Sequence, residues 1–81
     1  MDRGRGRVLN ACILIKTTPL QTESVLQKTA RLKGVRKAFV VYGRFDMIAF
    51  AATDDYPEIR RLTGTINAIE GVRSTETLVE A

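Results

Sequence analysis

The tetrapeptide Lys33-Gly34-Val35-Arg36 recurs as Glu70-Gly71-Val72-Arg73, 37 residues further along the chain. Each copy follows an apolar residue, Leu32 in the first case and Ile69 in the second, and each precedes a stretch that favours a β-strand. The interval is long enough for a helix, a turn and a strand. The repeat therefore predicts a chain built from two similar β-α-β halves.

The first half carries the signals of a strand followed by a helix. Residues 8–15 are rich in Val, Leu and Ile, which predicts a strand. In Thr18-Pro19-Leu20-Gln21 a capping residue precedes a proline at the first helical position and a Gln three residues after the cap. This pattern predicts a capping box that starts a helix, which we expect to end near residue 32. Gly34 suits the position just past a helix end, where the backbone turns left-handed.

A hairpin and a second helix follow. The turn at Gly43-Arg44-Phe45 separates two apolar stretches, and Asp54 and Asp55 favour a helix start by complementing the helix dipole. The remaining elements expected are strands over 35–42, 46–52 and 72–79 and a second helix that ends near residue 69. The order β-α-β-β-α-β is the ferredoxin-like arrangement. We therefore expect an α+β fold, with an antiparallel four-stranded sheet and two helices on one face.

The predicted strands are apolar at consecutive positions, as in Ala11-Cys12-Ile13-Leu14-Ile15 and Ala38-Phe39-Val40-Val41-Tyr42. A sheet with one face in water would instead alternate apolar and polar residues. One face takes the helices, so the other also needs cover. A second copy that packs sheet to sheet about a two-fold axis would supply it. We therefore expect an obligate dimer with facing sheets, a dimeric α+β barrel.

Composition excludes several kinds of chemistry. The 81 residues support one domain. Cys12 is the only cysteine and histidine is absent, which excludes a disulfide within the chain, a Cys/His zinc site and histidine acid–base catalysis. No nucleophile–base pair or carboxylate dyad stands at a useful spacing, so we expect no enzyme, no metal and no other cofactor. Because no apolar run approaches the roughly 18 residues that span a bilayer, we expect a cytoplasmic protein without a membrane partner.

The N-terminus is basic. Arg3, Arg5 and Arg7 together with Asp2 account for +2 of the formal net charge of +4. We expect a basic flexible tail over 1–7 and a folded domain over 8–81. Such a tail could contact nucleic-acid phosphates, although short basic ends are more often solvated.

Two motifs resemble those of a known family. Tyr42-Gly43-Arg44-Phe45-Asp46 contains G-x-x-D between two apolar strands, and residues 71–77 follow the pattern G-V-R-x-T-x-T. In this order, over residues 8–81, the chain resembles the effector-binding (RAM-type) ligand-binding domain of the Lrp/AsnC feast/famine transcription regulators. Those regulators carry an N-terminal helix-turn-helix domain, which seven residues cannot form. The chain therefore resembles the stand-alone form of the effector domain, and we expect no direct DNA binding.

The resemblance implies a ferredoxin-like fold, dimers with facing sheets, and assembly into octamers or similar rings. It also implies a small-molecule effector, usually an amino acid, that binds between neighbouring dimers. The positions that match the family's ligand site are Gly43, Arg44, Phe45 and Asp46 together with Ser74, Thr75 and Thr77.

Each of these side chains also has a purely structural interpretation. Asp46 can pair with the ammonium group of an amino-acid ligand, while Arg44 and turn amides bind the carboxylate of that ligand. Asp46 can equally accept hydrogen bonds from turn amides. Thr75 and Thr77 are β-branched, and such residues favour strands whether or not a ligand is present.

The leading hypothesis is an oligomeric amino-acid-binding module that acts in transcription regulation, alone or together with full-length regulators of the family. The alternative is a structural assembly partner that co-oligomerises with a full-length regulator and binds no ligand itself. An amino-acid-binding domain of the ACT type would instead pair its sheets side by side. An RNA-binding sheet is disfavoured, because its aromatic signature lies on the third strand, whereas Phe39 and Tyr42 stand on the second.

Overall fold

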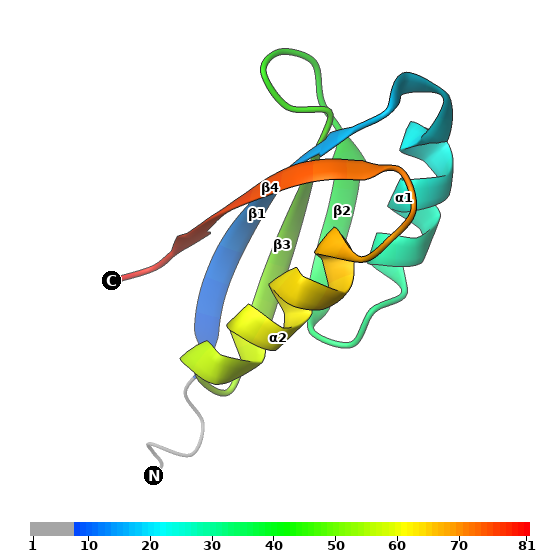
Figure 1. The fold of residues 1–81 in the computed structure, drawn as a ribbon. Helices are drawn as coiled ribbons and strands as arrows, with labels where there is room; N and C mark the ends of the chain where they lie inside the picture. Colours follow the sequence, from blue (N-terminus) through cyan, green and yellow to red (C-terminus); the bar gives the residue numbers. More distant parts are fainter. Residues whose placement is uncertain (1–7) are drawn as a thin grey trace, which may run out of the picture.

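The computed structural model describes residues 8–81, so the predicted basic tail over 1–7 lies outside the described residues. The secondary structure follows the expected β-α-β-β-α-β order (Figure 1). The elements are β1 (Leu9–Thr17), the 3-10 helix η2 (Pro19–Gln21), α1 (Thr22–Ala30), β2 (Val35–Val40), β3 (Met47–Thr53), α2 (Tyr56–Asn67) and β4 (Val72–Val79). Neither helix of the described chain is long and apolar enough to cross a membrane.

The four strands form one antiparallel sheet in the order β2-β3-β1-β4, and both helices lie on the same face of it (Figure 1). The ferredoxin-like fold is therefore confirmed. β1 is a central strand, because it pairs with β3 on one side and with β4 on the other. Its register with β4 shifts between Lys16 and Thr17, at the end of the strand.

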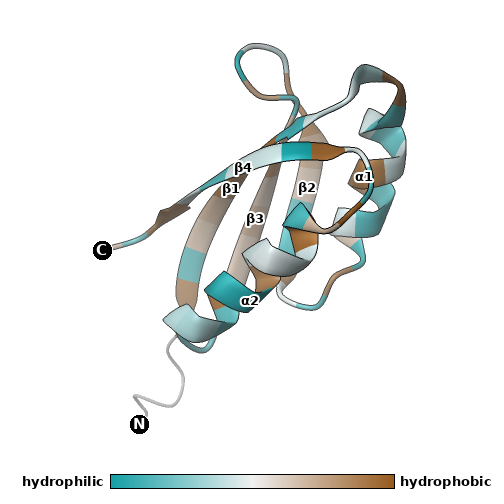
Figure 2. Cartoon of the chain, in the orientation of Figure 1, coloured by the Kyte–Doolittle hydropathy of each residue, from teal (hydrophilic) through white to brown (hydrophobic). Residues whose placement is uncertain are grey.

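The hydrophobic core fills the space between the sheet and the helices. Alternate residues of β1 and β3 point into it, among them Ile13, Ile15 and Met47, each of which is fully buried. Val25 from α1 and Ile66 from α2 meet them from the other side. Full burial of each such side chain contributes about 1.5–3 kcal/mol. Figure 2 shows apolar residues along β1, β2 and β3, whereas β4 and the helices carry many polar residues.

The two helices begin differently. At α2 the predicted cap is confirmed, because the Asp55 Oδ1 accepts a hydrogen bond from the Glu58 amide at 3.0 Å. At the first helix the predicted capping box is wrong. The Thr18 hydroxyl donates to the Gln21 side chain at 2.5 Å, the η2 turn comes first, and α1 starts only at Thr22. Thr18 instead joins the two halves of the chain, because its amide donates to the Gly71 carbonyl at 2.9 Å.

The ends of the domain meet at one edge of the sheet. Glu80 donates its amide to the Asn10 carbonyl at 3.0 Å. Its side-chain Oε1 accepts hydrogen bonds from the Asn10 amide at 2.6 Å and from the Asn10 Nδ2 at 2.7 Å. These bonds extend the β1–β4 pairing beyond the last residue of β4.

The repeated glycines both have the positive φ that their place after a helix predicts, +98° at Gly34 and +102° at Gly71. They differ in the space around them. A Cβ at Gly34 would meet no atom nearer than 3.6 Å, whereas a Cβ at Gly71 would lie 2.8 Å from the Gln21 Cβ and 3.0 Å from a Val25 methyl group. Gly71 thus marks a close approach between the α2–β4 turn and α1.

We expect Gly71→Ala to destabilise the fold more than Gly34→Ala. Both substitutions force an alanine into left-handed backbone, at a cost of about 1–2 kcal/mol. The collision with Gln21 adds about 1–3 kcal/mol at Gly71 alone. Urea unfolding of both variants at one protein concentration measures the difference. Equal unfolding free energies would show that the α1 contact at Gly71 is not tight.

Candidate functional site

The predicted G-x-x-D motif lies in the loop between β2 and β3, which projects from one end of the sheet (Figure 1). Gly43 has φ +134°, a conformation that side chains rarely adopt, and it faces open space. The base of the loop is closed by two backbone hydrogen bonds of 2.9 Å, from the Val41 amide to the Asp46 carbonyl and from the Asp46 amide to the Ile15 carbonyl. The loop is therefore anchored to the end of β1.

The Asp46 carboxylate braces this end of β1. Its Oδ2 accepts a hydrogen bond from the Thr17 amide at 2.8 Å and lies 3.5 Å from the Thr17 hydroxyl. Thr17 is the residue at which the β1–β4 register shifts, and it is only 3% exposed. Asp46 thus satisfies a buried amide at the point where the regular pairing ends. Asp46 therefore has a structural role, although its partner is the Thr17 amide of β1 and not the expected turn amide, and contact with a ligand stays a prediction.

The threonines of the T-x-T pattern face the helices. Thr75 donates to the Asn67 Oδ1 at 3.1 Å, and the Thr77 and Thr63 hydroxyls are 3.2 Å apart. In the sheet, Thr75 lies across from Ile15 and Ser74 lies across from Lys16. Asp46 bonds to Ile15 from the other side of β1, so all three residues are at the same end of the sheet. Thr77 lies two residues further from that end. The structure therefore brings Ser74 and Thr75 to the Asp46 end of the sheet, and it ties Thr77 to α2.

Two uncovered apolar side chains at this end are not among the site residues predicted from the sequence. Tyr42 is 98% exposed and Leu20 is 99% exposed. Tyr42 belongs to the Asp46 loop, and Leu20 follows the end of β1. Arg44 is exposed beside Tyr42, and Phe45 is half-buried. The exposure of Leu20 could have been predicted from the sequence, because this apolar residue lies outside the positions expected to form the buried face of the first helix. The exposure of Tyr42 could not be predicted in the same way, because the residue was expected to lie in a strand over 35–42, whereas β2 ends at Val40.

The sheet face without helices is also apolar, as expected. Phe50 is 42% exposed and Leu78 is 53% exposed, and both lie across from Cys12 of β1. The rings of Phe50 and Phe39 pack with their centroids 5.8 Å apart. Burial raises the pKa of the Cys12 thiol. Cys12 therefore stays protonated at neutral pH and acts as a small apolar residue of this face.

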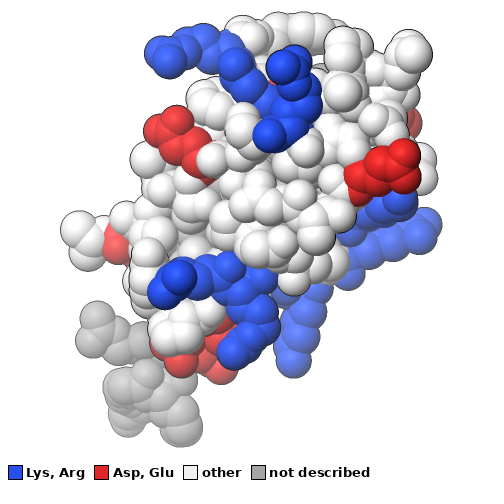
Figure 3. Space-filling view, viewed as in Figure 1, with Lys and Arg blue, Asp and Glu red and all other residues white. Residues whose placement is uncertain are grey.

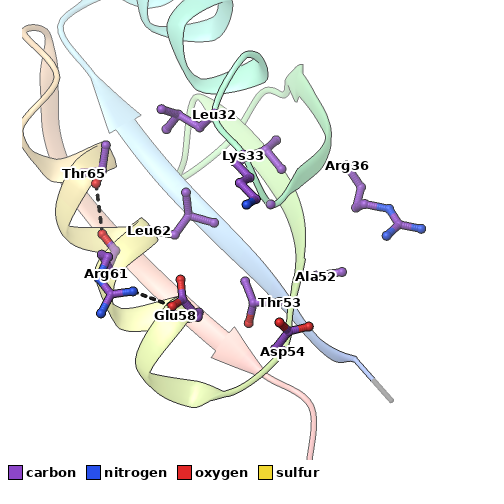
Figure 4. Close-up of a pocket in the computed structure, with 12 residues that line it drawn as sticks. Leu32, Lys33, Arg36, Ala52, Thr53, Asp54, Glu58, Arg61, Leu62 and Thr65 are labelled. Carbon is purple, nitrogen blue, oxygen red and sulfur yellow. Dashed lines mark hydrogen bonds and ion pairs between the residues drawn. The ribbon is translucent and has the colours of Figure 1, made fainter. Parts of the chain in front are cut away.

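A cavity of about 640 Å³ lies at the opposite end of the sheet, between the α1–β2 turn and α2 (Figure 4). Its apolar wall includes Leu32 and Leu62, which point into it in Figure 4. On α2, Arg61 and Glu58 form an ion pair of 2.5 Å. The charged residues that line the cavity are Lys33, Arg36, Asp54, Glu58 and Arg61.

Charge is mixed on the face of the molecule that Figure 3 shows. On the face shown in Figure 3, Lys and Arg side chains stand at separated places with Asp and Glu between them. A nucleic-acid-binding face would carry a continuous basic stripe. Within residues 8–81 there is also no group of three or more Cys, Asp or Glu side chains placed to hold a metal ion.

We expect Asp46→Ala to destabilise the fold by about 1–3 kcal/mol, because it leaves the buried Thr17 amide without an acceptor. Asp46→Asn should cost less, since the amide oxygen can still accept that bond. Urea unfolding of the two variants measures the contrast. If both lose the same stability, the Thr17 hydrogen bond does not brace the loop.

Comparison with known proteins is consistent with this geometry. A family model for the Lrp/AsnC ligand binding domain matches residues 10–80. The solved structure of TTHA0845 from Thermus thermophilus is 28% identical with a TM-score of 0.86, and the match covers 90% of this chain and 92% of that one. The hypothetical protein PHS023 from Pyrococcus horikoshii is 27% identical with a TM-score of 0.81, with 90% and 89% covered.

A third structure is the transcriptional regulator NMB0573 from Neisseria meningitidis in complex with L-Met. It is 16% identical with a TM-score of 0.78, and the match covers 90% of this chain but only 49% of the regulator, so it shows a shared fold alone. None of the curated proteins compared with the chain matches it significantly. The family model spans nearly the whole chain, which therefore belongs to the Lrp/AsnC ligand-binding domain family.

Proposed function

We propose that this chain is an oligomeric amino-acid-binding module that acts in transcription regulation as a stand-alone effector domain in the cytoplasm. The family assignment supports the binding of a small molecule. The regulator from Neisseria meningitidis, which shares the fold, was solved with L-Met, and this supports amino acids as the first ligands to test. The module regulates through its assembly with itself or with full-length regulators, without direct contact to DNA.

The observation that carries the proposal is the setting of the Asp46 carboxylate. Its partners are the amide and the hydroxyl of Thr17, which are neutral groups. They fix the carboxylate in place without neutralising its charge. A carboxylate can accept about four hydrogen bonds, so it retains capacity for a ligand ammonium group. Arg44, exposed two residues earlier, can pair with the ligand carboxylate.

The proposed site is open in a single chain. Leu20 and Tyr42, both almost fully exposed, flank it. Apolar side chains left this bare commonly mark a contact with another molecule. We place the neighbouring dimer of a ring there, so that a second chain covers the loop and completes the site around Gly43, Arg44, Phe45 and Asp46 and around Ser74, Thr75 and Thr77.

The dimer itself forms through the sheet face without helices. Phe50 on the central strand β3 and Leu78 on the edge strand β4 are about half exposed on this face, and Phe39 packs beside Phe50. Charged residues lie at its margin, including Lys37 on β2 and Glu80 at the edge of β4. An apolar centre with a charged margin is the anatomy of a protein interface. A second copy of the chain, with the same face, is the proposed partner.

We expect Phe50→Asp to convert the assembly to monomers, because the substitution places a charge at the centre of the interface. Tyr56→Asp is the matched control: Tyr56 is also an exposed aromatic, but it stands at the start of α2 on the helix side, where an acidic residue complements the helix dipole. Light scattering measures the mass of each. A wild-type protein that stays a folded monomer of 9.0 kDa would contradict the dimer.

We expect one or more of the twenty amino acids to raise the melting temperature of the wild-type protein. A ligand at 100 times its dissociation constant stabilises the fold by about 2.7 kcal/mol. Asp46→Asn should keep the dimer and weaken binding of that amino acid about 10- to 150-fold, the equivalent of one lost charge-assisted hydrogen bond. Calorimetric titration of both proteins measures the change. An unaltered affinity removes Asp46 from the ligand site.

The alternative function predicts a different outcome. An assembly partner that binds no ligand itself would show no thermal shift with any amino acid, yet it would form mixed oligomers with a full-length regulator of the family. Mass analysis of the two proteins after co-expression would detect such mixtures. Absence of a thermal shift together with mixed oligomers would favour this second function.

A further inference from the structure

The two repeated turns form equivalent corners of the fold, and one is closed while the other is open. The turn after each helix contains the repeated glycine, and it packs against the other helical segment. At the Gly71 corner, a Cβ on the glycine would lie 2.8 Å from the Gln21 Cβ and 3.0 Å from a Val25 methyl group, both closer than van der Waals contact. At the Gly34 corner the nearest atoms, from Leu62 and Thr53, are 3.6 Å from a Cβ position.

Side chains hold the closed corner together. The Gln21 Nε2 donates to the Glu70 Oε2 at 3.3 Å, across the gap between the turn and the helix start. The Thr18 amide donates to the Gly71 carbonyl at 2.9 Å. The corner therefore has no room for a ligand.

The equivalent residues of the open corner make different contacts. The residue 37 positions after Gln21 is Glu58, and the residue 37 positions before Glu70 is Lys33. Glu58 turns to Arg61 of its own helix and pairs with it at 2.5 Å instead of bridging to the turn. The cavity of about 640 Å³ occupies the space between them, with Lys33 on one side and the Glu58–Arg61 pair on the other (Figure 4).

The lining of this cavity suits a small molecule with two opposite charges. Its volume is within the range of about 300–1,000 Å³ that is usual for ligand sites. Lys33 and Arg61 offer cations to a carboxylate, and Glu58 offers an anion to an ammonium group. Leu32 and Leu62 provide an apolar wall for an aliphatic side chain.

We propose that the open corner between the α1–β2 turn and α2 is a second ligand site, which binds a free aliphatic amino acid as its zwitterion. The carboxylate lies between Lys33 and Arg61, the ammonium group lies at Glu58, and the side chain packs on Leu32 and Leu62. This site is at the opposite end of the sheet from Asp46, and it does not depend on the ligand site of the proposed function.

The experiment uses L-leucine as the probe in the Asp46→Asn background, in which binding at the loop site should be weakened about 10- to 150-fold. Calorimetric titration should detect binding. Lys33→Gln and Glu58→Gln should each weaken it about tenfold or more, since each removes a charge-assisted hydrogen bond. Glu70→Gln is the matched control, because it removes a charge from the equivalent closed corner. It should leave the affinity for L-leucine unchanged within about twofold.

Two truncated probes test the zwitterion. 4-Methylpentanoate has no ammonium group and isoamylamine has no carboxylate, so each should bind at least about tenfold more weakly than L-leucine. Equal binding of either would overturn the assignment of a zwitterion. An affinity for L-leucine that is unchanged by Lys33→Gln and by Glu58→Gln would overturn the site itself. So would the absence of detectable L-leucine binding to the Asp46→Asn protein.

The location is checked independently by amide NMR shifts in the wild-type protein. Titration with L-leucine should move the resonances of Lys33, Thr53 and Thr65, which line the cavity. A response confined to residues 43–46 would support the loop site and overturn the second one. A response confined to the cavity would support the second site and count against the loop site, so the two proposals fail separately.

Discussion

The rest of the fold depends on β1, which needs hydrogen-bond partners along both of its edges and packing partners on both of its faces. It is a central strand, so its backbone pairs on both edges, and its side chains face the helices on one side and an uncovered apolar surface on the other. Where its pairing with β4 shifts register, the Thr17 amide needs another acceptor, and Asp46 supplies one at 2.8 Å. Asp46, which we propose as a ligand contact, is thus also the residue that completes the central strand. Any ligand that draws on its charge acts on the end of β1.

The sequence was sufficient to predict the fold because its local signals agree with each other. The glycines after the helices, the acidic cap of α2 and the apolar strands all point to the same arrangement. The prediction was wrong at the start of the first helix, where Thr18 offers a good local cap. In the folded chain Thr18 contacts Gly71, 53 residues away. A contact so distant in the sequence leaves no local pattern, and it adds to the local contact that Thr18 makes with Gln21.

The candidate site could be predicted only in part, for a related reason. The G-x-x-D and T-x-T patterns predicted candidate residues at one end of the sheet, but they did not reveal that Thr75 and Thr77 hydrogen-bond α2 side chains. No sequence motif indicated the cavity at the opposite end of the sheet, because the cavity arises from a difference between the two copies of the repeat. Lys33 in one copy corresponds to Glu70 in the other, and Glu58 corresponds to Gln21. Only the structure shows that a cavity lies between Lys33 and Glu58, whereas Gln21 and Glu70 bond to each other and close the equivalent space.

The pairing of β1 with β4 also affects how the chain folds as it is made. Among the strands of this domain, the central strand β1 is synthesised before the others, and one of its two partners, β4, is synthesised after them. Until Glu80 and its neighbours are free to bind Asn10, one edge of an apolar strand stays unpaired. Unpaired edges of this kind are where nascent chains aggregate. Rapid closure of the C-terminal strand is therefore as important to the yield of folded protein as the stability of the finished sheet.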